Sequence, residues 1–88
     1  KVTPRSPLFF NLTADEVNEN LTITFQSALE EADITVTDKD GNVVVSEFKT
    51  SIYEGKTVSV PNSDSYPYLV EITSPRLDIE AEITSEDY

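Results

Sequence analysis

Apolar and polar residues alternate one by one in four stretches of the chain, at residues 21–26, 34–37, 58–60 and 77–84. In the last stretch, four apolar residues alternate with three acids and a threonine without a break. Successive side chains of a β-strand point to opposite faces of its sheet, so this period of two predicts strands with one buried face. Val, Ile and Thr, whose branched side chains suit a pleated sheet, supply 25 of the 88 residues. The pattern predicts an all-β chain.

Turn-forming residues separate these stretches at regular intervals. Gly41 can adopt the positive φ of a tight hairpin turn, and Pro75 ends one strand before Leu77 starts the next. Short strands with turns spaced in this way are typical of a sandwich or a barrel. We predict seven antiparallel strands, at residues 7–13, 20–26, 32–38, 43–50, 56–60, 66–74 and 77–84.

Helix-capping patterns occur twice, at residues 13–16 and 27–30. Neither is followed by enough helical sequence to continue, and isolated short helices are marginal in water. We therefore assign both segments to loops, each with room for one helical turn.

The charge balance is strongly acidic, and reactive side chains are few. Six Lys and Arg stand against 17 Asp and Glu, which gives a net charge of −11, and the chain has no Cys, His or Met. Disulfides, thiol nucleophiles, imidazole bases and the usual zinc ligands are therefore excluded. An acidic surface disfavours nucleic acid, and no apolar run approaches the length of a membrane span. We expect no enzymatic activity, catalytic residue or cofactor, no nucleic-acid partner and no membrane insertion.

Three acids, Asp78, Glu80 and Glu82, fall on one face of the last predicted strand. Residues two apart in a strand are separated by roughly 6.6–6.8 Å, which overlaps the carboxyl spacing of inverting glycosidases. Acid catalysis also needs one carboxyl with a raised pKa in a cleft, whereas an outer strand exposes all three to water. We interpret these acids as a charged face that keeps an edge strand from pairing with other chains.

Asp38, Asp40 and Asn42 are the candidate metal ligands of the sequence. Side-chain oxygens at alternate positions can face one Ca²⁺ ion. The run departs from the EF-hand pattern, because its glycine stands fourth instead of sixth and no glutamate stands twelfth. A hairpin turn explains the same residues, so we predict no metal site and keep the three as weak candidates.

Tyr53, Tyr66 and Tyr68 are a candidate aromatic platform for a ligand. The alternative assigns Tyr68, or failing that Tyr66, to a tyrosine corner, in which the hydroxyl of a tyrosine near the start of a strand bonds to the backbone upstream. Carbohydrate binding through these tyrosines, or calcium binding through Asp38 and Asp40, forms the second function hypothesis, that of a ligand-binding accessory domain.

Alternation fails at residues 43–45 and 68–70, where both faces of a strand carry apolar side chains. We expect four side chains to point inward, those of Val44, Phe48, Val70 and Ile72. The side chains that then point outward are those of Val43, Val45 and Leu69. An exposed apolar patch indicates a protein partner, which can be a second copy in a homodimer. Coverage of the patch by the segment 8–12 is the alternative.

Three segments, LTITF at 21–25, ITVTDKDGNVV at 34–44 and YLVEIT at 68–73, resemble one protein family. This is a family of small exported immunoglobulin-like proteins of gut Bacteroidales whose function is unknown. The likeness covers residues 20–84 and departs at 61–66, where such domains often have a Gly just before the Tyr strand. It implies a seven-stranded immunoglobulin-like β-sandwich of Greek-key type, and it carries over no catalytic residue.

The chain starts at Lys1, which is expected of a processed product or a fragment. Because the resemblance implies an extracytoplasmic setting, in the periplasm, on the cell surface or secreted, we expect that a signal peptide has been removed. We predict an exposed tail at 1–6, a sandwich domain at 7–84 and a second tail at 85–88. The sequence thus favours a non-enzymatic interaction or structural module of an exported bacterial protein.

Overall fold

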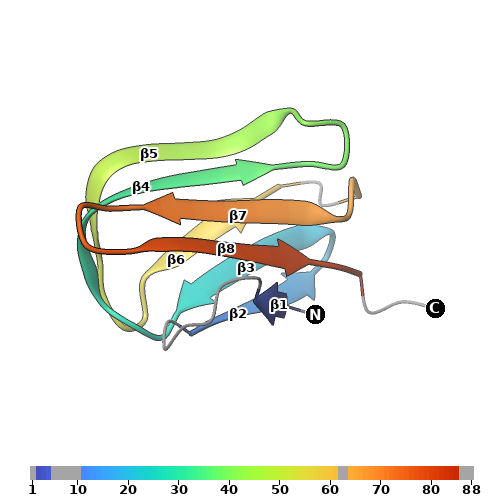
Figure 1. The fold of residues 1–88 in the computed structure, drawn as a ribbon. Coiled ribbons are helices and arrows are strands. Elements are labelled where there is room, and N and C mark those ends of the chain that lie inside the picture. Colours follow the sequence, from blue (N-terminus) through green and yellow to red (C-terminus); the bar gives the residue numbers. More distant parts are fainter. Residues whose placement is uncertain (1, 5–10, 62–63, 86–88) are drawn as a thin grey trace.

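The computed structural model describes residues 2–4, 11–61 and 64–85. These residues form eight β-strands and no helix. Figure 1 shows how the strands are arranged. The strands are β1 (Val2–Pro4), β2 (Leu12–Val17), β3 (Asn20–Phe25), β4 (Leu29–Thr37), β5 (Val43–Ile52), β6 (Thr57–Val60), β7 (Tyr68–Thr73) and β8 (Asp78–Ile83). Seven of them have at least four residues, and β1 has three. The all-β prediction is confirmed.

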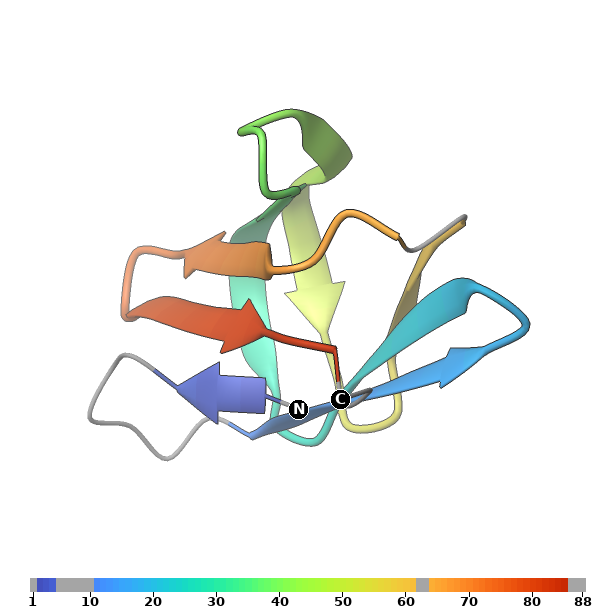
Figure 2. The ribbon, with the colours of Figure 1, turned by 90° about the vertical axis from the view of Figure 1, so that its right-hand side faces the viewer.

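The strands form two antiparallel sheets that pack face to face (Figure 2). The five-stranded sheet has the order β1-β8-β7-β4-β5, and the three-stranded sheet has the order β2-β3-β6. The connections β3–β4, β5–β6 and β6–β7 each carry the chain from one sheet to the other. The predicted β-sandwich is confirmed.

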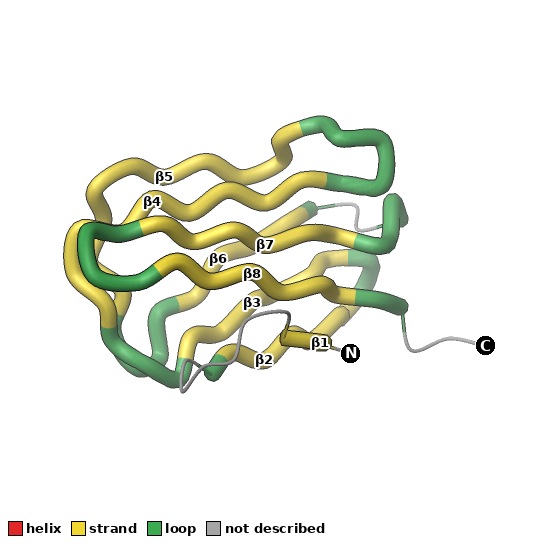
Figure 3. The backbone as a smooth tube through the Cα atoms, in the orientation of Figure 1, coloured by secondary structure: helices red, strands yellow, loops and turns green. Residues whose placement is uncertain are grey.

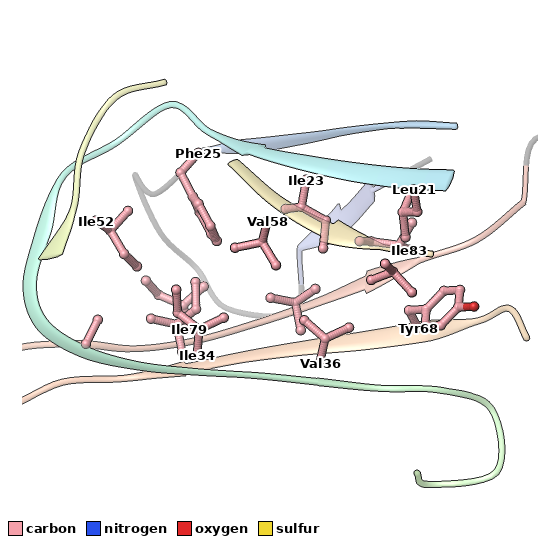
Figure 4. Packing of buried hydrophobic residues seen from close by; sticks show 14 of the residues in the cluster. Leu21, Ile23, Phe25, Ile34, Val36, Ile52, Val58, Tyr68, Ile79 and Ile83 are labelled. Atoms are coloured by element: carbon pink, nitrogen blue, oxygen red, sulfur yellow. The ribbon is translucent and has the colours of Figure 1, made fainter. Parts of the chain in front are cut away.

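Apolar side chains from both sheets meet in the core between them (Figure 4). Phe25 of the three-stranded sheet and Ile34 of the five-stranded sheet are both 0% exposed. The alternating apolar positions that predicted the strands supply most of this core. Its buried members are Leu21, Ile23, Phe25, Leu29, Ala32, Ile34, Val36, Ile52, Val58, Val60, Tyr68, Val70, Ile72, Ile79 and Ile83.

The first long strand differs from its predicted position. Residues 7–10 of the predicted strand lie outside the described residues, and β2 starts at Leu12 and continues through residues 13–16, which we predicted as a loop. The reason is hairpin pairing, because every residue of β2 is in register with the next strand, β3. The two-residue turn between them, Asn18-Glu19, has positive φ at both positions, 52° and 67°, as a type I′ hairpin turn requires.

Two other segments predicted as irregular also take part in the sheets. The tail prediction for residues 1–6 is wrong at Val2–Pro4, because β1 pairs with residues 81–83 of β8 and extends the five-stranded sheet. The second helix-capping segment, 27–30, is a loop only at its first two residues, since β4 starts at Leu29. In the predicted carboxy-terminal tail, residues 86–88 lie outside the described residues.

Candidate interaction surface

The sheet register places two of the three predicted patch residues on either side of Thr37. Thr37 of β4 pairs with Val43 of β5 and with Leu69 of β7. Residues directly opposite in register share a face. Because the neighbouring Val36 and Val70 are buried in the core, this row points away from it. We call this side of the five-stranded sheet, which faces away from β2, β3 and β6, the outer face. Val43 is 59% exposed and Leu69 is half-buried.

The third patch residue, Val45, points the other way. It pairs with the core residue Val36 and packs against the core, so its predicted outward position is wrong. The register of β4 and β5 shifts between Val36 and Thr37, where Val44 is an extra residue on β5. Val44 was predicted to point inward and is 38% exposed. A bulge, which has no sequence signature here, changes the phase of alternation and reverses both assignments.

Phe48, which we also expected in the core, is 74% exposed. The preceding Glu47 pairs with the core residue Ile34, and its carboxylate lies 3.3 Å from the Nζ of Lys56, next to β6. Glu47 therefore faces the other sheet, and Phe48, the next residue along the strand, faces outward. Val70 and Ile72 are buried, as predicted.

Exposed apolar side chains gather on β5 and on the turn that follows it. Among the described residues, the large exposed hydrophobic side chains on this stretch are those of Val43, Val44, Phe48 and Tyr53, and the other is Val17 of β2. Among the described strands, β5 lies at the edge of its sheet and pairs only with β4. This strand is the main apolar surface that the described part of the chain presents to solvent.

Acidic side chains occupy the other half of the outer face. Glu71 of β7 stands directly opposite Glu80 of β8, and Glu82 stands opposite Leu69. The predicted role of the β8 acids in protecting a free edge applies only to the start of that strand, because β1 pairs with its end. The outer face thus changes from apolar at β5 to acidic at β7 and β8.

We expect salt to stabilise the fold. The net charge is −11, and the Glu71–Glu80 pair places like charges opposite each other. The melting temperature should be higher in about 0.3 M than in about 0.02 M sodium chloride, because salt screens this repulsion. Glu71→Lys should raise the stability by about 0.5–1 kcal/mol and reduce the salt effect more than Asp15→Lys, which changes the net charge equally on β2. A melting temperature that stays level or falls with salt would contradict the prediction.

The three tyrosines do not form a shared platform. Tyr68 is 2% exposed, and its hydroxyl accepts a hydrogen bond of 3.2 Å from the backbone N–H of Ser65, three residues upstream. This is the hydrogen bond expected of a tyrosine corner. The Tyr66 ring packs edge-to-face on Tyr68, and its hydroxyl donates to the Glu16 carboxylate of β2. Tyr53 lies at the other end of β6, in the β5–β6 turn.

The candidate calcium ligands form the turn of the β4–β5 hairpin (Figure 3). The Oδ1 of Asp38 accepts hydrogen bonds of 2.9 Å from the backbone N–H groups of Asp40 and Asn42, and its Oδ2 accepts one from the Asn42 amide. Gly41 has a φ of 85°. The Asp38 carboxylate therefore holds its own turn, as the hairpin interpretation predicted.

The stability that this turn contributes is small, and it depends on pH. The hydrogen bond from the backbone N–H of Asn42, helped by that of Asp40, lowers the pKa of Asp38 from its usual 3.8. A lowered pKa in the folded state adds stability above the unfolded pKa, and this stability is lost as the pH falls through the folded pKa. The wild-type chain should therefore melt above Asp38→Asn near neutral pH, and the difference should shrink in acid. Asp40→Asn is the control, and an Asp38 difference that does not change with pH refutes the assignment.

A hollow of about 570 Å³ lies at the end of the sandwich, between the β3–β4 connection and the β7–β8 turn. Its lining is Ala28, Leu29, Glu30, Arg76 and Leu77. The two charged residues, Glu30 and Arg76, are exposed to solvent. Because catalysis by such groups needs shielding from water, this hollow does not suggest a reaction.

Within the described ranges, no three His, Cys, Asp or Glu side chains come together as metal ligands could. The same part of the chain contains no helix long and apolar enough to cross a membrane. No protein-family model and no curated protein matches the sequence.

Proposed function

We propose that this chain is a non-enzymatic interaction module that binds a protein partner through the outer face of its five-stranded sheet. The observation that carries the proposal is the exposure of Val43 and Phe48 on edge strand β5, with Leu69 on the same face of the sheet across β4. Exposed apolar side chains on a small domain are costly in water, and their gathering on one strand is typical of a contact surface. The outer face offers a partner apolar contact area at β5 and negative charge at β7 and β8.

The setting belongs to the same proposal. We infer an exported bacterial protein with an extracytoplasmic location, on the resemblance of residues 20–84 to small exported immunoglobulin-like proteins. The immunoglobulin-like, Greek-key type is supported by the connections that cross between the sheets and by the Tyr68 corner at the start of β7. Both features are expected of that type of sandwich.

A ligand-binding accessory domain is less well supported. Carbohydrate binding by the three tyrosines needs them side by side, whereas Tyr68 is in the core and Tyr53 is separated from Tyr66 by the length of β6. Calcium binding needs carboxylate oxygens turned toward an ion, whereas the Asp38 oxygens accept hydrogen bonds from their own turn. The geometry therefore favours the protein partner.

A double lysine substitution on the outer face tests the proposal. Val43→Lys with Leu69→Lys places two charges in the apolar part of the surface, and we expect it to abolish the capture of a partner from native envelope extract. Both positions lie outside the core, so the melting temperature should change little.

The matched control is Val17→Lys with Ser59→Lys, which adds the same charge at exposed positions of the three-stranded sheet. This control should keep the partner. If the outer-face variant leaves the hydrodynamic size and all binding unchanged, or if the control loses binding equally, the outer face is not the contact surface.

A further inference from the structure

We propose that the outer face binds a cationic protein segment that also carries apolar side chains. This inference rests on the proposed function and names the chemistry of its partner. Its basis is the way in which the sheet register arranges apolar and acidic side chains across one face.

Two rows of paired residues cross the outer face from β5 to β8. The first row is Val43, Thr37, Leu69 and Glu82, and the second is Ser46, Thr35, Glu71 and Glu80. Neighbouring strands lie about 4.7–4.9 Å apart, so each row is roughly 14 Å long. Each row is uncharged at β5 and ends in a carboxylate at β8. Phe48 continues the apolar end along β5.

The face is the binding surface, and the free edge of β5 is not. The register of β5 with β4 shifts at Val44 and again after Glu47. The stretch of regular pairing between these two bulges is therefore only three residues long, 45–47. Bulges twist an edge strand and protect it from pairing with a further strand. A partner therefore contacts the side chains of the outer face and does not extend the sheet.

The charges select a cationic partner over a second copy of this chain. Two copies of the chain, each with a net charge of −11 and with Glu71 on this face, repel each other. A segment with Lys or Arg above Glu71 and apolar side chains above Val43 and Phe48 matches the face in charge and in hydrophobicity. Electrostatic complementarity of this kind gives specificity and fast association.

A defined peptide tests the inference. A short capped peptide of alternating lysine and valine is titrated into the ¹⁵N-labelled chain, and amide chemical shifts report where it binds. We expect shifts at Val43, Leu69 and Glu71. We also expect a loss of affinity of about tenfold in Glu71→Lys and of less than about twofold in Asp15→Lys, which changes the net charge equally on the other sheet.

Three results would overturn the inference. An equal loss in Asp15→Lys would mean that net charge alone attracts the peptide. Equal binding of a glutamate–valine peptide would mean that the partner need not be cationic. Dimerisation through this face would identify a second copy as the occupant. In the last two cases the proposed function survives if Val43→Lys with Leu69→Lys still abolishes binding, so the two failures are distinguishable.

Discussion

Replacing Phe25 with alanine is expected to unfold much of the protein, whereas the same change at Phe48 should leave its stability nearly unaltered. Phe25 is 0% exposed between the sheets, and Phe48 is 74% exposed on β5. Removing a buried phenylalanine costs about 3–5 kcal/mol, a large part of the total stability of a domain this small. An exposed substitution changes stability by about 0.5 kcal/mol or less.

Urea denaturation followed by far-ultraviolet circular dichroism measures both variants. The Phe25→Ala midpoint should fall sharply, and the Phe48→Ala midpoint should stay close to that of the wild-type chain. Comparable losses in the two variants would mean that Phe48 is packed in solution, and would remove the main support for an apolar surface on β5.

Changes at Lys49 are expected to produce the second largest difference in stability. Lys49 lies at the second irregularity of β5 with a φ of 48°, a left-handed conformation that glycine adopts freely and β-branched residues strongly avoid. Its backbone N–H donates to the Oδ1 of Asp33 at 2.8 Å, which fixes this backbone. Lys49→Ala is the reference, because it removes the same charge as the other two variants. Relative to it, the free energy of unfolding should be about 1 kcal/mol higher in Lys49→Gly and about 1–2 kcal/mol lower in Lys49→Ile.

The control for this series is Ser51→Gly, two residues further along β5. Ser51 is exposed and does not have a positive φ, so glycine there should cost about 0.5–1 kcal/mol. Thermal melts of the four variants give the order. If Lys49→Gly is less stable than Lys49→Ala, the bulge at this position is absent from the folded protein.

The core residues were predictable because the alternation of apolar and polar residues follows directly from the need to bury one face of a strand. A strand between solvent and a core needs apolar residues at every second position, and β3, β7 and β8 follow this rule in a regular register with their partners. The Tyr68 hydrogen bond followed from the position of the residue at the start of a strand. Both inferences depend on local sequence and on burial alone.

The surface was less predictable because bulges alter the phase of alternation. Val44 is an extra residue opposite β4, so Val45 turns into the core, and Phe48 points outward after Glu47 turns toward Lys56. The residue types at these positions do not indicate a bulge. The positive φ at Lys49 could not be predicted because the residue is not a glycine, whereas Gly41 indicated a turn. Pairing with the next strand, β3, likewise made β2 a strand across residues with a helix-capping pattern.

The most direct test of the account is a hydrogen-exchange footprint of the chain with the partner that it captures from native extract. The account predicts protection on β5 and β7 around Val43, Phe48 and Leu69, with β2 around Val17 unchanged. Protection confined to β2, or to the hollow lined by Leu29 and Arg76, would contradict it.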